Sequence, residues 1–267
     1  MKKAIGIFDS GVSGLTVYKA IRASFPEEDL IYFGDTARVP YGPKSPNTII
    51  DYSIQNSRFL LQQGIKTLIV ACNTSSAVAL PAINKLTDIP IIGVIDPGAE
   101  QAARNTVNKR IGVIGTEGTI RSGAYTAAIQ KLLPDATVFP QACPLFVPIV
   151  EEGWQDHEVA FNIAEEYLNP LKGLDIDTLV LGCTHYPLLR NVIQRIMGPS
   201  VTLVDSADAI TEYLSRLLPS DSDGISGKDR FFVSDNEDKF ARISKQILHD
   251  KFGTLARVRL FESWFQD

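Results

Sequence analysis

The chain has 267 residues, of which 45% are hydrophobic and 21% are charged, and its net charge is −5 with a sequence pI near 5.3. This composition predicts a soluble globular protein with one large or two small α/β domains. The acidic balance and the lack of basic runs argue against nucleic acid as a partner. An acidic small molecule is still compatible with this net charge as a substrate, because a few local hydrogen-bond donors can hold a carboxylate.

The N-terminal sequence has two lysines but only a short apolar stretch before Asp9, which predicts a first strand rather than a signal peptide. No apolar run reaches the roughly 18–20 residues needed to span a membrane. The three cysteines include no C-x-x-C pair, which disfavours a disulfide scaffold or a zinc ribbon. We therefore expect a cytoplasmic protein with reduced thiols and no membrane partner.

Short apolar strands alternate with helical patterns along the chain. The predicted strands are Ala4–Phe8, Leu30–Phe33, Thr67–Ala71, Ile91–Val94, Arg110–Ile114, Ala136–Phe139, Thr178–Gly182 and Val201–Val204. The predicted helices are Gly14–Ser24, Thr48–Gln63, Gly98–Asn105, Gly123–Leu133, Glu158–Leu171 and Leu188–Met197. This alternation predicts a mainly parallel α/β sheet whose strands are buried on both faces.

A tail follows the polar loop Ser220–Gly227. It is predicted to form a strand at Arg230–Ser234, a helix to about Phe252 and a strand at Val258–Phe261. We expect this tail to return and complete the first domain.

The sequence also contains a weak internal repeat. Thr67–Thr74 resembles Thr178–His185, Gly6–Ser10 resembles Gly112–Thr116, and Val94–Asp96 resembles Leu203–Asp205, in the same order and at nearly the same spacing. Two buried α/β strands can look alike without duplication, but the matched cysteines favour a repeat of a whole α/β unit. We therefore predict two similar parallel-sheet domains, 1–95 with 210–267 and 96–209, with the active site in the cleft between them.

Cys72 and Cys183 occupy the matched ends of two predicted strands, where ligands bind in parallel α/β folds. Each is followed by small polar residues and then a predicted helix, whose dipole would favour the thiolate. The alternative is that both are ordinary buried cysteines. Cys143, which precedes Pro144, lacks this context and is interpreted as a core or loop residue.

Other polar residues fall at the same predicted edge. Asp9 and Ser10 follow the first strand, either over the cleft or in a plain turn with an aspartate cap. His185, two residues after Cys183, would either exchange a proton with a thiol or have a structural role, which is the commoner one for a lone histidine. Further candidate ligand-binding residues are Tyr41, Gly42, Asn73, Thr74, Thr116, Thr119 and Thr184. Of these, Tyr41 and Gly42 would offer a hydroxyl and a backbone N–H, and the two threonines after Gly115 would bind a carboxylate or cap a helix.

Two facing thiols can form a disulfide, bind a metal or act as two bases. A metal would need more His or Cys ligands, and a redox role would need a C-x-x-C pair. Racemisation at Cα needs a group on each face that serves as both base and acid, which suits a duplicated unit. No lysine stands at a strand end to hold pyridoxal, so we expect no cofactor, with donors at the site stabilising the developing charge.

The segments FDSGVSGLTV, VPYG, ACNTSSA and GCTHYP closely resemble the glutamate racemases, bacterial enzymes of the aspartate/glutamate racemase superfamily, and the resemblance spans nearly the whole chain. It implies cofactor-independent interconversion of L- and D-glutamate, which supplies D-glutamate for peptidoglycan and so for cell-wall biogenesis and cell shape. It also implies two similar α/β domains and, because such enzymes are often dimers, a homodimer. The alternatives are a racemase of aspartate or another acidic amino acid, or a metal- or ligand-binding protein of the same fold.

The resemblance also implies roles for single residues. Cys72 would act on D-glutamate and Cys183 on L-glutamate, with Asp9 and His185 as catalytic neighbours and Glu151 as an auxiliary acid. The ligand-binding pairs would be Asp9 with Ser10, Tyr41 with Gly42, Asn73 with Thr74, and Thr184 with His185. One position departs from the family pattern: Ser13 stands where the family has glycine. We expect this change to perturb the loop only slightly.

Overall fold

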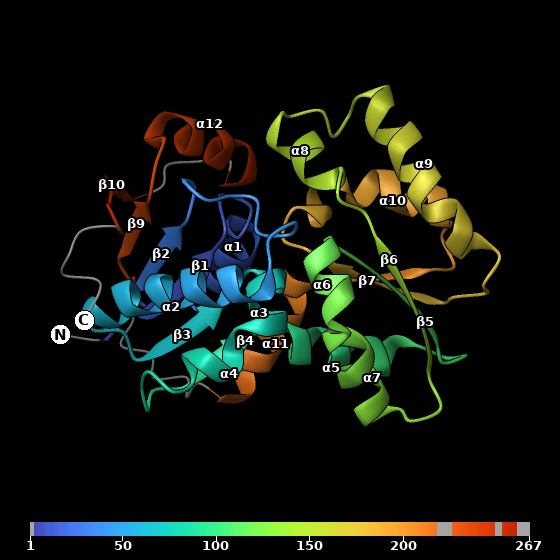
Figure 1. Ribbon diagram of the computed structural model, residues 1–267, viewed down its shortest axis with the longest axis horizontal. Coiled ribbons are helices and arrows are strands. Elements are labelled where there is room, and N and C mark those ends of the chain that lie inside the picture. The colour runs from blue at the N-terminus through green and yellow to red at the C-terminus, as the bar shows by residue number, and fades with distance from the viewer. Residues whose placement is uncertain (1–2, 218–225, 249–252, 261–267) are drawn as a thin grey trace.

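The computed structural model describes residues 3–217, 226–248 and 253–260, which form two parallel sheets with helices on both faces of each (Figure 1). The predicted fold, a pair of parallel-sheet α/β units, is therefore confirmed. Within the described part of the chain, no helix is both long and apolar enough to cross a membrane.

The first sheet has the strand order β10-β9-β2-β1-β3-β4. Its strands are β1 (Ile5–Asp9), β2 (Leu30–Gly34), β3 (Thr67–Val70), β4 (Ile91–Gly93), β9 (Asp229–Val233) and β10 (Thr254–Arg257). One face packs against α1 (Leu15–Ser24), α11 (Ser206–Leu217) and α12 (Glu237–Leu248), and the other against α2 (Pro46–Gln62) and α4 (Leu80–Ile83). The short helix α3 (Asn73–Val78) follows β3 directly. Each face therefore has its own apolar core, as strands buried on both sides require.

The second sheet has the strand order β6-β5-β7-β8. Its strands are β5 (Arg110–Gly115), β6 (Thr137–Ala142), β7 (Thr178–Gly182) and β8 (Thr202–Asp205). Helices α5 (Ile95–Asn105) and α7 (Ala124–Leu132) cover one face, and α8 (Phe146–Glu151), α9 (Glu158–Lys172) and α10 (Arg190–Met197) cover the other. The remaining elements are α6 (Glu117–Ser122) and the 3₁₀ helix η1 (Tyr186–Leu189).

The two sheets share one topology. The order β2-β1-β3-β4 in the first corresponds to β6-β5-β7-β8 in the second, and β9 and β10 are added at one edge of the first. The repeated sequences also occupy equivalent registers, because Ile5 pairs with Thr67 in the first sheet and Ile111 pairs with Thr178 in the second. Cys72 and Cys183 therefore follow equivalent central strands, which agrees with a duplicated unit.

The C-terminal tail returns to the first sheet, where β9 pairs with β2 and β10 pairs with β9. The predicted strand at Val258–Phe261 is wrong: β10 ends at Arg257, because its partner strand ends at Val233. Phe261, the predicted helix end at Phe252 and most of the predicted polar loop lie outside the described residues. Helix α11 contacts both α1 and α5, and the domain boundaries near residues 95 and 209 stay a prediction.

Candidate active site

The candidate site lies where the central strands of both sheets end. Asp9 is the last residue of β1, and Cys72, Thr116 and Cys183 follow β3, β5 and β7. All four side chains are at least nine-tenths buried. The predicted clustering of strand-end residues is therefore observed, with residues from both halves of the duplication meeting in one place.

Cys72 is the residue that precedes α3, and its side chain is 4% exposed. Burial raises the pKa of its thiol, and the negative charge of Asp9 raises it further, whereas hydrogen bonds from Ser75 and Ser10 oppose the shift. The helix N-terminus that was expected to favour the thiolate is thus outweighed by removal of the sulfur from water.

Cys183 is 6% exposed and precedes the 3₁₀ helix η1 rather than an α-helix. Its Sγ lies 3.6 Å from Nδ1 of His185. Burial raises the pKa of the Cys183 thiol well above its usual value, and the backbone N–H of His185 only partly offsets this effect. The two thiols therefore share burial but differ in their polar neighbours: a histidine beside one, and two serines beside the other.

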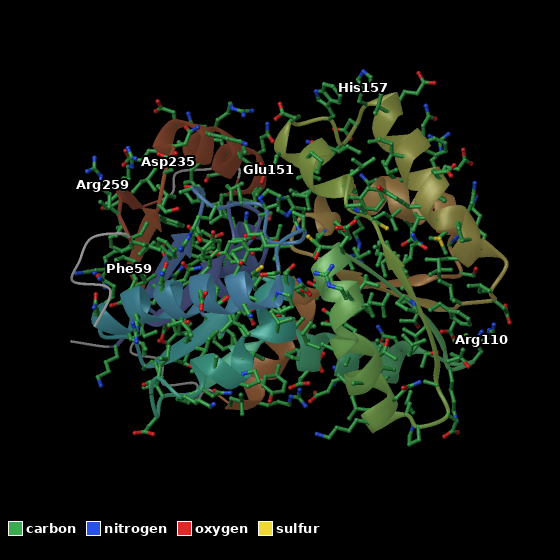
Figure 2. The ribbon with its side chains drawn as sticks, viewed as in Figure 1. Phe59, Arg110, Glu151, His157, Asp235 and Arg259 are labelled. Atoms are coloured by element: carbon green, nitrogen blue, oxygen red, sulfur yellow. The ribbon has the colours of Figure 1, made fainter. Side chains whose placement is uncertain are left out.

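His185 is held from both sides. Its Nε2 lies 3.4 Å from the carboxylate of Glu151, and its Nδ1 lies 2.8 Å from Oγ of Ser13. Glu151 in turn forms a 3.0 Å ion pair with Lys239 of α12. Figure 2 shows Glu151 where the ribbons of α8 and α12 approach each other. Burial alone would raise the pKa of Glu151, but His185 and Lys239 together lower it to about 2.

Asp9 is fully buried and is not the N-cap residue of α1, a position that Gly14 occupies. Instead its carboxylate accepts a 2.9 Å hydrogen bond from the Gly11 N–H and a 3.3 Å hydrogen bond from the Thr184 hydroxyl. Burial raises the pKa of Asp9, while the charge of His185 and these donors pull it down. Asp9 therefore links the first half of the site to Thr184 in the second half.

Thr74, Thr116 and Thr119 form a cluster of hydroxyl groups, called here the threonine cluster. The Oγ1 of Thr74 lies 2.9 Å from that of Thr116 and 3.2 Å from that of Thr119. Thr116 also caps α6 by accepting a hydrogen bond from the Thr119 N–H, so the capping interpretation of Thr116 is confirmed. The cluster joins the end of β3 in the first half to the end of β5 in the second.

Asn73 and Gly42 also connect the two halves. Asn73 accepts a 2.7 Å hydrogen bond from the Tyr125 hydroxyl and donates a 3.1 Å bond to Ser206. The carbonyl of Gly42 accepts from the Gly118 N–H at 2.9 Å, and a Cβ on Gly42 would stand 2.7 Å from Cβ of Thr116. Only glycine allows this close approach between the halves.

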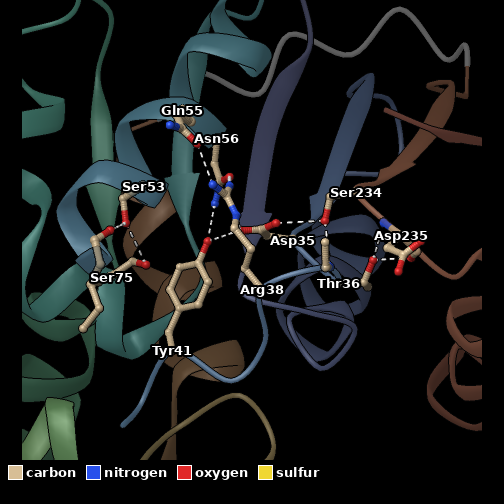
Figure 3. A network of polar contacts seen from close by, with 12 residues as sticks. Asp35, Thr36, Arg38, Tyr41, Ser53, Gln55, Asn56, Ser75, Ser234 and Asp235 are labelled. Atoms are coloured by element: carbon tan, nitrogen blue, oxygen red, sulfur yellow. Dashed lines mark hydrogen bonds and ion pairs between the residues drawn. The ribbon is translucent and has the colours of Figure 1, made fainter. Parts of the chain in front are cut away.

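Tyr41 belongs to a buried polar network (Figure 3). Its hydroxyl donates to Asp35 and accepts a 3.0 Å bond from Asn56, and Arg38 also pairs with Asp35. The hydroxyl expected to reach a ligand is thus hydrogen-bonded inside the protein. The network fixes the loop between β2 and α2, which carries Gly42 into the site.

Sequence reasoning does not single out two residues of this network, namely Ser13, which contacts His185, and Lys239, which contacts Glu151. Ser13 was noted only as a departure from the family pattern, and Lys239 lies in the C-terminal tail. Their contacts with the second half span 172 and 88 residues of sequence. Ser13 alone left a trace in the sequence that could have revealed its contact, because a serine stands where the family pattern has a glycine without a side chain.

Comparisons with known proteins agree with this arrangement. Residues 5–214 match the family model described as Asp/Glu/hydantoin racemase. A glutamate racemase of Geobacter metallireducens is 52% identical over 262 residues, which cover 97% of each chain.

Solved structures give the same result. The crystal structure of a glutamate racemase isoform from Bacillus anthracis superposes with a TM-score of 0.93 at 39% identity, covering 97% of this chain and 98% of the other. The glutamate racemase from Francisella tularensis, solved in complex with D-glutamate, gives a TM-score of 0.91 at 37% identity with the same coverage.

Proposed function

The chain belongs to the Asp/Glu/hydantoin racemase family, and from that premise we propose that Cys72 and Cys183 exchange protons with opposite faces of the Cα of glutamate. The reaction is the interconversion of L- and D-glutamate, an isomerisation. The observation that carries the two-thiol proposal is the placement of two free, buried thiols after equivalent strands of a duplicated unit. Because the reaction runs in both directions, each thiol must serve as base in one and as acid in the other.

Cys183, beside His185, acts on L-glutamate, and Cys72, beside Asp9 and the serines, acts on D-glutamate. Ionising a buried thiol is unfavourable in the free protein, as the raised pKa values of both cysteines reflect. The positive ammonium group of a bound amino acid would favour the thiolate, because an opposite charge stabilises the ionised form in a dry site. Substrate binding would therefore activate the base that it needs.

The α-carboxylate must be held by hydrogen-bond donors so that charge developing at Cα is stabilised. The candidates are Ser10, Asn73, Thr74, Thr184 and the N–H groups of short helix starts, together with the threonine cluster. Tyr41 contributes through its backbone beside Gly42, because its hydroxyl is bonded to Asp35 and Asn56. His185 and Asp9 adjust the protonation of the thiols, and Glu151 holds the imidazole of His185.

We place the reaction in the cytoplasm of a bacterial cell, where its product D-glutamate supplies peptidoglycan synthesis, and we propose that the protein acts as a homodimer. No cofactor is needed in this mechanism. An aspartate racemase is the less favoured alternative, since the relatives near 50% identity are named as glutamate racemases.

The purified protein, given either enantiomer of glutamate without pyridoxal, is expected to produce a racemic mixture measurable by circular dichroism. Aspartate run in parallel is expected to react at a small fraction of that rate. Aspartate turnover equal to or faster than that of glutamate would overturn the substrate assignment. Racemisation that persists in the double variant Cys72→Ala/Cys183→Ala would overturn the two-thiol mechanism.

A further inference from the structure

Ser13 lies in the turn between β1 and α1, where the family pattern has glycine. Its side chain is buried, with 1% exposed, and its φ angle is not positive, so a serine fits this position without backbone strain. Its Oγ lies 2.8 Å from Nδ1 of His185 and 2.8 Å from Oγ1 of Thr184. A single hydroxyl of the first half thus bonds two site residues of the second, a pair of contacts that glycine would lack.

These contacts are part of a continuous line of groups. From Nδ1 of His185 the line runs 2.8 Å to Ser13, 2.8 Å on to Thr184, and 3.3 Å from Thr184 to Oδ1 of Asp9. One end stands beside the second thiol, since Nδ1 lies 3.6 Å from Cys183 Sγ. The other end is a carboxylate whose charge acts on the first thiol. Ser13 and Thr184 together are called here the hydroxyl bridge.

A two-thiol racemase must restore its protons between turnovers. Conversion of L- to D-glutamate leaves a proton on Cys183 and takes one from Cys72, so a second turnover in the same direction needs a proton to move back across the site. Both thiols are buried, at 4% and 6% exposure, which slows direct exchange with water. An internal path between the halves would therefore be useful to the enzyme.

Resting on the proposed two-thiol function, we propose that the hydroxyl bridge passes protons between His185 and Asp9 and so resets the two halves of the site without bulk water. The proton of Cys183 first moves to Nδ1 of His185. Nδ1–H then gives its proton to Ser13, Ser13 gives its own to Thr184, and Thr184 gives its own to Asp9. The imidazolium becomes neutral and Asp9 becomes a carboxylic acid. Asp9 then gives its proton to the Cys72 thiolate, so that Cys183 ends as a thiolate, Cys72 ends as a thiol and no proton is gained or lost.

The hydrogen-bond pattern suits both ends of this transfer. The ionised carboxylate of Glu151 can only accept, so Nε2 of His185 keeps its hydrogen and Nδ1 is the nitrogen that changes state. Before transfer each donor points toward Asp9, and after it each points back toward His185, so the two hydroxyl groups must rotate before another proton can move in the same direction. Burial raises the pKa of Asp9, so this carboxylate can hold a proton briefly. The proton then stands on the half of the site that must next donate one.

The test measures how the rate depends on glutamate concentration. When reset is slow, rising substrate and product trap the enzyme in the wrong protonation state, and net turnover falls at high total glutamate. Ser13→Gly and Ser13→Ala remove the bridge, and their net rate at high glutamate is expected to drop at least about tenfold, a typical factor for losing a hydrogen bond to a charged group. This loss should exceed any loss of kcat/KM measured at low glutamate.

Three controls make the result specific. Ser13→Thr keeps the hydroxyl and is expected to restore the wild-type concentration dependence. Ser57→Ala removes another buried hydroxyl, one that bonds only the Ser53 carbonyl of its own helix, and should behave as wild type. A small buffer such as imidazole should restore the high-glutamate rate of Ser13→Gly, because it supplies an external path for the proton.

Equal concentration dependence in wild type, Ser13→Gly and Ser13→Ala would overturn the bridge and leave the two-thiol mechanism intact. A loss of kcat/KM at low glutamate as large as the loss at high glutamate would also overturn it, in favour of a purely structural role for Ser13. Failure of the wild-type protein to racemise glutamate would instead overturn the proposed function itself.

Discussion

The ammonium of Lys239 lies 3.0 Å from the carboxylate of Glu151, and this ion pair joins the returning tail to the second half of the site. Because Glu151 also contacts His185, the charge of a residue in α12 reaches the imidazole beside Cys183. The C-terminal tail therefore does more than extend the first sheet, since it takes part in holding His185 through Glu151.

Replacing Lys239 by Met should raise the pKa of Glu151 toward its usual value and loosen its hold on His185. Since the Lys239 side chain is 37% exposed, the loss in unfolding free energy at neutral pH should be at most about 1 kcal/mol. Urea denaturation measures this loss. The matched control is Lys245→Met, an exposed lysine on the same helix.

The same substitution, Lys239→Met, should change how the free energy of unfolding depends on pH in the acid range. The folded-state pKa of Glu151 is lowered to about 2 from a usual 4.5, so its ionised form stabilises the protein above pH 4.5, and that stabilisation is lost as the pH falls toward 2. In Lys239→Met this loss should be smaller. An acid limb identical to wild type would contradict a direct charge interaction between Lys239 and Glu151.

Replacing Gly42 by Ala should impair the site, because the new methyl group would stand 2.7 Å from Cβ of Thr116. Moving the two halves apart should cost about 1–3 kcal/mol of stability, as overpacking does, and should lower kcat/KM for both enantiomers. Gly173→Ala is the control, since a Cβ there meets nothing within 4 Å. Normal kinetics in Gly42→Ala would show that the threonine cluster tolerates displacement.

Replacing Tyr41 by Phe distinguishes a structural hydroxyl from a ligand-binding one. The hydroxyl bonds Asp35 and Asn56, so its removal leaves buried polar groups with fewer partners and should cost about 1–3 kcal/mol of stability. The KM for glutamate should change little. The adjacent Tyr52, whose ring centroid lies 5.6 Å away, supplies the control Tyr52→Phe. A large rise in KM with unchanged stability would show instead that the Tyr41 hydroxyl binds the ligand.

The dependence of kcat/KM on pH should follow the raised pKa values of the thiols. A base works only when deprotonated, so raising its pKa moves the activity limb to higher pH. Because burial raises the pKa of both Cys72 and Cys183 above the usual 9.0, kcat/KM should still be rising at pH 9 in both directions. A plateau reached below neutral pH would mean that neither thiol is the base in the free enzyme.

Much of the site could be predicted because it follows from strand ends. Cys72 and Cys183 each follow an apolar β-strand, and in a parallel sheet such positions gather at one edge whatever the details of packing. The repeat then predicted that the two cysteines occupy equivalent positions. The structure agrees, because the two sheets share one strand order and each cysteine follows the corresponding strand.

Contacts between the halves could not be predicted in the same way. Whether Ser13 meets His185, or Lys239 meets Glu151, depends on how two sheets are set against each other, and no local pattern encodes that. The misplaced final strand has a similar cause, because the end of β10 is set by where its partner β9 ends and not by its own sequence. The helix dipole was expected to favour the thiolates, but burial raises the pKa of both thiols instead. The extent of that burial depends on the whole fold and could not be predicted from the local sequence.

Deuterium incorporation tests the central claim most directly. In the first turnover of wild-type enzyme equilibrated in D₂O, deuterium should appear at Cα of the product enantiomer and the remaining substrate should stay unlabelled, because separate groups remove and deliver the proton. Cys72→Ala and Cys183→Ala should each abolish racemisation, whereas Cys143→Ala, at a buried thiol outside the site, should retain it. Equal labelling of substrate and product in the wild type, or racemisation by either site variant, would contradict the two-thiol account.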